Sequence, residues 1–201
     1  TTNDELERHP INEWIENYIE TNDDVPQWYP NLFSGMPSYG GYIYMNGDPT
    51  KYIREEILFN PGQRIWLYMV IWSIGMYVLL RFLGISKYSS LIGGLVSCLT
   101  PYTFGLINAG HLNKIFAMAY IPWIIYSSIN LIRTTNIKSL LILSIFTALQ
   151  LWTNHPQVAY YTWMVIGFYY FWLIISSIRQ GIKPAQKIFK PLLYCFFGVI
   201  I

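Results

Sequence analysis

Two short polar segments interrupt the long apolar runs of this chain and contain residue types that could do chemistry. Residues 110–114 read GHLNK and residues 153–157 read TNHPQ. His111 and Lys114 are three residues apart, which places them on one side of a helix start. With Asn113 and the free backbone N–H groups of a helix N-terminus, they are suited to a phosphate. The alternative is that Lys114 extends to a membrane interface and His111 packs in a loop.

The second segment predicts a turn that leads into an aromatic helix start. Asn154 and Pro156 are common turn formers, Gln157 can cap a helix, and residues 160–163 read YYTW. An interfacial aromatic belt explains such rings without a ligand. A carbohydrate or a lipid headgroup would use the same rings, with His155 beside them, and both interpretations stay open.

A general base must come from the N-terminal part of the chain, unless a histidine serves. All eleven acidic residues lie within residues 4–56. The candidates are Asp4, Glu5, Glu7, Asp23, Asp24 and Asp48. The histidines and carboxylates lack the spacing of a metal site, and no GxSxG motif indicates a Ser-His-Asp hydrolase. No metal or cofactor is therefore predicted.

The composition and the charge distribution predict a membrane protein in two parts. Of the 201 residues 53% are hydrophobic and 12% charged, whereas soluble domains carry about 25% charged residues. Residues 1–62 are predicted to form an acidic, extracytoplasmic head, in which INEWIENYI at 11–19 indicates an amphipathic helix. Residues 63–201 are predicted to form a transmembrane bundle, so the fold class is all-α and polytopic. Nothing in this charge distribution indicates a nucleic-acid partner.

The bundle is predicted to contain five complete spans and the start of a sixth near residue 188. The complete spans are 64–83, 90–108, 115–132, 138–153 and 157–178. About 20 apolar residues cross a bilayer, so 138–153 is short, and Pro101 is expected to kink or end the second span. Because the chain lacks an initial Met and ends inside an apolar run, we expect a fragment truncated at both ends.

Basic residues predict the orientation of the spans. The loops at 81–89, 133–138 and 179–190 carry eight Lys and Arg residues, whereas the loops at 109–114 and 154–156 carry only Lys114. Cytoplasmic loops are enriched in Lys and Arg. The head, GHLNK and TNHPQ are therefore expected to share the outward face.

Three motifs, in this order, resemble the bacterial YfhO-type membrane proteins. They are WYPNLFSGMPSY at 28–39, GHLNKIFAMAYIPW at 110–123 and NHPQVAYYTW at 154–163. That family is placed with the GT-C class of polytopic glycosyltransferases. The resemblance implies a GT-C-like bundle in the bacterial cytoplasmic (inner) membrane. It also implies sugar transfer from a polyprenyl-phosphate donor at the outer face, with an acidic residue of the first outward loop near the acceptor.

The resemblance also implies roles for individual residues. By its order along the chain, Asp4 matches the family's acidic residue, and Glu7 is the second candidate. His111, Asn113 and Lys114 would hold the donor phosphate. The residues expected to contact substrate are Trp28, Asn31, Tyr39, Asn154, His155 and Gln157.

The sequence therefore predicts a membrane glycosyltransferase whose partners are a lipid-linked sugar donor, a cell-envelope polymer or lipid acceptor, and membrane lipids. In an inverting transfer the carboxylate would take the acceptor proton while Lys114 and His111 steady the leaving phosphate. The alternative is a non-enzymatic transporter or flippase-like protein. Transporters place ionisable groups near the bilayer midplane, whereas polar residues within the runs here, such as Ser144 and Thr147, are uncharged.

Overall fold

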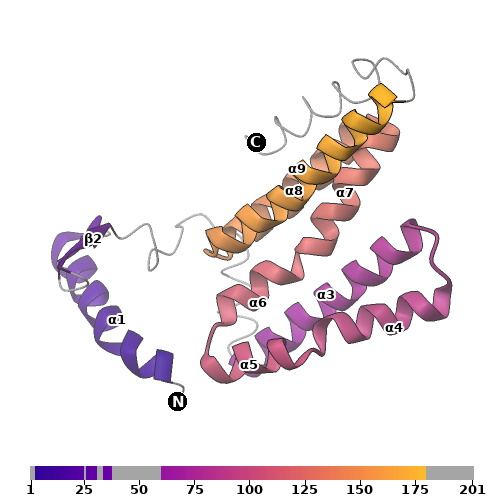
Figure 1. Cartoon of the computed structure of the whole chain (residues 1–201). Helices are drawn as coiled ribbons and strands as arrows, with labels where there is room; N and C mark the ends of the chain where they lie inside the picture. The colour runs from indigo at the N-terminus through magenta and orange to yellow at the C-terminus, as the bar shows by residue number, and fades with distance from the viewer. Residues whose placement is uncertain (1–2, 25, 31–33, 38–59, 180–201) are drawn as a thin grey trace.

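The computed structural model describes residues 3–24, 26–30, 34–37 and 60–179, and this part of the chain is mostly helical (Figure 1). The described elements are α1 (Asn3–Asn22), β1 (Trp28–Tyr29), β2 (Met36–Pro37), α3 (Pro61–Phe82), α4 (Lys87–Cys98), α5 (Pro101–Ala109), α6 (Leu112–Ala119), α7 (Ile121–Thr134), α8 (Ile137–Trp152) and α9 (Pro156–Arg179). The sixth span that the sequence predicts near residue 188 lies outside the described residues.

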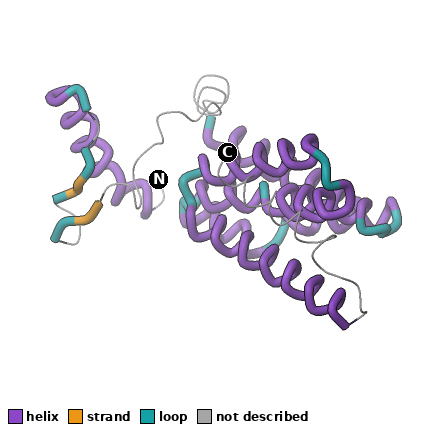
Figure 2. Tube along the Cα trace, turned by 90° about the horizontal axis from the view of Figure 1, so that it is seen from above, coloured by secondary structure: helices purple, strands orange, loops and turns teal. Residues whose placement is uncertain are grey.

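The N-terminal elements form a small unit beside the bundle in both views (Figures 1 and 2). The helix predicted over 11–19 is confirmed within α1, where Trp14, Ile15 and Tyr18 are half-buried and Glu13 and Glu16 are exposed. Trp14 meets the buried Tyr29 edge to face, with ring centroids 5.6 Å apart. β1 and β2 pair antiparallel. Gly35, in the turn between them, has φ +109° and lies under the Trp28 ring, so a side chain there would be strained.

Four of the described helical segments are long and apolar enough to cross a membrane. They are Gly62–Phe82, Lys87–Ala109, Leu112–Thr134 and Pro156–Arg179. The apolar α8 has 16 residues, which at ~1.5 Å per residue is about 24 Å, shorter than a hydrocarbon core of about 30 Å. The short span predicted at 138–153 is therefore confirmed as a short apolar helix.

Exposed apolar side chains support a membrane environment. Along α4, Tyr88, Ile92 and Val96 are 79%, 63% and 60% exposed, and Phe168 of α9 is 67% exposed. In water, an apolar surface of this extent would drive aggregation or association. In a bilayer, the same surface faces lipid. We conclude that the described helices belong to a membrane protein.

Two of the spans are broken helices. The predicted break at Pro101 is confirmed: α4 ends at Cys98, and the Thr100 side chain accepts a hydrogen bond from Thr103 N at 3.2 Å to cap α5. The break between α6 and α7 was not predicted. There Pro122 stands at the start of α7, where its missing N–H costs little.

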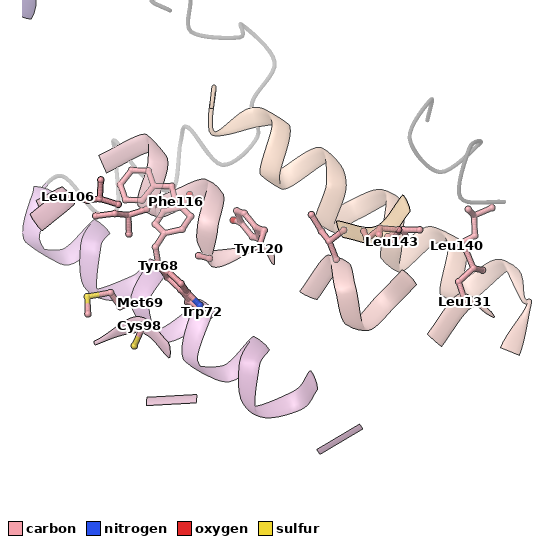
Figure 3. Packing of buried hydrophobic residues seen from close by; sticks show 14 of the residues in the cluster. Tyr68, Met69, Trp72, Cys98, Leu106, Phe116, Tyr120, Leu131, Leu140 and Leu143 are labelled. Carbon is pink, nitrogen blue, oxygen red and sulfur yellow. The ribbon is translucent and has the colours of Figure 1, made fainter. Parts of the chain in front are cut away.

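Aromatic contacts hold the broken third span against α3. Tyr68 stacks on Phe116 with centroids 4.1 Å apart, and meets Tyr120 edge to face at 5.9 Å. Further along, Trp123 Nε1 donates to Ile71 O at 2.9 Å. Figure 3 shows Tyr68, Phe116 and Tyr120 gathered between α3 and α6, with Leu131, Leu140 and Leu143 continuing the core between α7 and α8.

The orientation of the spans can be tested by cysteine labelling. Ala109 and Ile137 are both exposed, the latter at 62%, and they occupy loops that the basic residues assign to opposite faces. In a right-side-out preparation, we expect an impermeant thiol reagent to label Ala109→Cys and not Ile137→Cys. Detergent should make both react, which controls for burial. The reverse pattern in intact membranes would overturn the predicted orientation.

Candidate functional site

The turn between α5 and α6 places His111 and Lys114 at one end of the bundle. Gly110 ends α5 with φ +84°, and His111 N donates to Leu106 O at 3.0 Å, which reverses the chain. Lys114 follows in the first turn of α6, half-buried, with Nζ 5.4 Å from the centroid of the Tyr102 ring. A cation over a tyrosine face is weakly stabilised, so the lysine charge is held in place without a carboxylate.

The turn between α8 and α9 brings His155 to the same end. The His155 side chain is half-buried, and its Nδ1 is enclosed with no hydrogen-bond partner in the described part of the chain. Burial lowers the pKa of His155 below its usual value, and the nearby charges of Lys114 and His111 lower it further. The imidazole of His155 is therefore mostly neutral near pH 7.

His111, Lys114 and His155 thus form what we call the basic cluster. It lies at the end of the bundle that the charge distribution predicts to face outward, which we call the outer end. The sequence predicted both turns there but assigned His155 to substrate and the other two residues to phosphate. In the structure the charges of Lys114 and His111 act on His155, so the three residues lie near one another. Since every acidic residue lies within residues 4–56, none belongs to α3–α9, so the charges that these helices place near the basic cluster are positive and favour an anion.

The remaining predicted residues of the outer end are neighbours in sequence of the basic cluster. Asn113 is half-buried in the first turn of α6, and Asn154 is half-buried with φ +55° in the turn before α9. Gln157 is exposed, and its Nε2 donates to Tyr161 OH at 3.0 Å. This bond lies along the surface of α9, so Gln157 and Tyr161 form the rim of the outer end.

Several predicted residues cannot be placed with the basic cluster. Asn31 and Tyr39 lie outside the described residues. Asp4 and Glu7 lie in the first turns of α1, where the backbone alone is described. Trp28 is described in β1 and is 54% exposed, against Gly35. Whether a carboxylate of the head reaches the basic cluster stays a prediction.

Sequence reasoning missed Gln150. This residue is fully buried in α8, and its Nε2 donates to Ala117 O of α6 at 3.1 Å and to Thr162 Oγ1 of α9 at 3.0 Å. A signal was present, because Gln150 is the one amide side chain in the run 138–153. Such a residue is costly in a membrane unless it bonds internally.

In comparisons with known proteins, no family model, no curated protein and no solved structure matches this chain. Within the described residues, no group of three or more His, Cys, Asp or Glu side chains is arranged to hold a metal ion. The chemistry of the site must therefore be argued from the basic cluster and its surroundings.

Proposed function

We propose that the basic cluster binds the phosphate of a lipid-linked sugar at the outward membrane face, and that the chain is part of a GT-C-type glycosyltransferase of the bacterial cytoplasmic membrane. The observation that carries the proposal is the meeting of Lys114, His111 and His155 at one end of apolar helices. A phosphate on a lipid tail would reach this end from the bilayer, with its tail against the exposed apolar faces of the spans.

The electrostatics favour an anion over a cation at this place. A positive ligand would face Lys114 with no carboxylate in α3–α9 to balance it. A phosphate would accept hydrogen bonds from Lys114 and from His155 once it is protonated, and charged hydrogen bonds of this kind are about twice as strong as neutral ones. The first turn of α6 adds the partial positive charge of a helix N-terminus.

Glycosyl transfer is the finer part of the proposal and rests on the resemblance of the three motifs. The acceptor would be a cell-envelope polymer or lipid, and its proton would pass to Asp4 or Glu7 of the head. The described spans carry charged residues only in their first or last turn, which disfavours an ion-coupled transporter.

The pH dependence of anion binding tests the role of His155. The probe is an alkyl glycosyl phosphodiester, whose charge stays constant between about pH 5 and 8, where histidines titrate. The free His155 has a lowered pKa and is neutral near pH 7, whereas a bound anion favours its protonated form. Binding therefore takes up a proton, and we expect the affinity to rise several-fold as the pH falls through this range.

The control removes the imidazole of His155. Glutamine does not titrate, so His155→Gln should abolish the rise in affinity that comes from the lowered pKa of His155. An affinity of the wild-type chain that does not change with pH would contradict the proposed anion site.

A further inference from the structure

Gln150 joins three helices one to two turns below the basic cluster. Its two N–H groups reach Ala117 O of α6 and Thr162 Oγ1 of α9, at 3.1 and 3.0 Å. Ala117 lies three residues after Lys114 on α6, and Thr162 lies seven residues after His155 on α9. One side chain of α8 therefore connects the helix that carries Lys114 to the helix that follows His155.

The break in the third span explains why the Ala117 carbonyl needs a donor. The carbonyls of the last turn of a helix lack their usual partners, and a bilayer supplies no water to replace them. Ala117 O receives a long bond from Tyr120 N, at 3.4 Å. The shorter bond from Gln150 Nε2 gives this carbonyl a second donor. A side chain of α8 thereby stabilises the break between α6 and α7.

The second acceptor of Gln150 is the hydroxyl oxygen of Thr162. The Thr162 hydroxyl donates to Val158 O at 2.8 Å, so its oxygen is left to accept from Gln150. An amide NH2 offers two donors in one plane. Among apolar residues, methionine is close in length but has no donor. A Gln150→Met chain would keep the packing volume and lose both bonds between helices.

We propose that Gln150 is a positioning residue of the basic cluster, which fixes α6 against α9 and so holds Lys114 beside His155. The inference rests on the proposed function for the use of the site, whereas the coupling itself is a property of the fold. If Gln150 had a structural role alone, its replacement would lower only the stability of the fold. If it positions the basic cluster, its replacement will also change the surroundings, and hence the titration, of His155.

The experiment uses the full chain in lipid nanodiscs with labelled histidine, and follows the titration of His155 by NMR. Gln150→Met should raise the pKa of His155 toward its usual value, because burial and the charges of Lys114 and His111 are what lower it. Because Lys114 would no longer be fixed beside His155, binding of the phosphodiester probe should weaken by about tenfold, which corresponds to about 1.4 kcal/mol.

Ser144→Ala is the matched control. Ser144 is buried in the same helix, but its hydroxyl donates to Leu140 O within α8, at 3.0 Å. Its loss should lower the thermal stability slightly and leave both the His155 titration and probe binding unchanged. A shift of the His155 titration in Ser144→Ala as large as in Gln150→Met would show that any loss in α8 perturbs the site, and would overturn the inference.

A second variant keeps the test decisive if Gln150→Met does not fold. Thr162→Val keeps the shape of the side chain and removes the Oγ1 acceptor of Gln150 together with the hydroxyl's own bond to Val158 O within α9. A smaller rise in the pKa of His155 and a smaller loss of probe binding are expected than in Gln150→Met. An unchanged His155 titration in the folded variants would overturn the positioning role. The proposed function fails separately, if Lys114→Gln leaves probe binding intact while Gln150→Met still shifts the His155 titration.

Discussion

Under the proposed function, replacing Lys114 by glutamine is expected to lower sugar transfer by roughly 30- to 900-fold, which corresponds to about 2–4 kcal/mol of lost transition-state stabilisation. This is the scale observed when a preorganised donor to a developing negative charge is removed. Lys114 is held over the Tyr102 ring and has no carboxylate to balance it in α3–α9. Its charge is therefore available to a leaving phosphate. Labelling of envelope glycans in cells, together with probe binding to the purified chain, measures the effect.

Two companion variants separate phosphate binding from a lysine that merely extends to the interface. Lys114→Arg should recover only part of the activity, because a planar guanidinium does not fit the site of a compact ammonium. Lys138→Gln makes the same change at an exposed residue of the opposite end and should have no effect. Glycan labelling that stays normal in Lys114→Gln would contradict the proposed binding of phosphate by Lys114, and GHLNK would then be an ordinary interfacial turn.

Gly75→Ala will destabilise the bundle by about 2 kcal/mol or more, although alanine normally favours a helix. Gly75 is buried in α3, where a Cβ would lie 2.6 Å from Trp123 Cδ1. The indole cannot retreat freely. Its Nε1 donates to Ile71 O at 2.9 Å, and its ring stacks on Phe146 at 4.9 Å. The melting temperature in a fixed detergent should fall clearly.

The same substitution elsewhere in the chain provides the control. A Cβ at Gly167 of α9 would meet nothing within 4 Å, so Gly167→Ala should be neutral or stabilise by up to about 1 kcal/mol through helix propensity. Equal melting temperatures for the two variants would mean that Trp123 does not hold α7 against α3 as the structure describes.

The sequence by itself determined the helices and most of their ends, because those depend on neighbours in the chain. Apolar runs predict spans by length alone. Pro101 predicts the break between α4 and α5, and in the structure Thr100 caps α5 and Asn136 caps α8, each by accepting from a backbone N–H three residues on. The turns that carry GHLNK and TNHPQ were predicted for the same reason.

Only the tertiary structure decided which of these polar residues meet. His155 lies in the turn before α9 and Lys114 in α6, and no periodicity relates them, so their proximity depends on how α6, α8 and α9 pack. The third span was predicted as one helix because its apolar pattern continues through Pro122. It is in fact broken, and within its own span the Ala117 carbonyl accepts only a long bond from Tyr120 N. In a bilayer such a carbonyl needs a better donor. That donor is Gln150 of another helix, which sequence patterns cannot show.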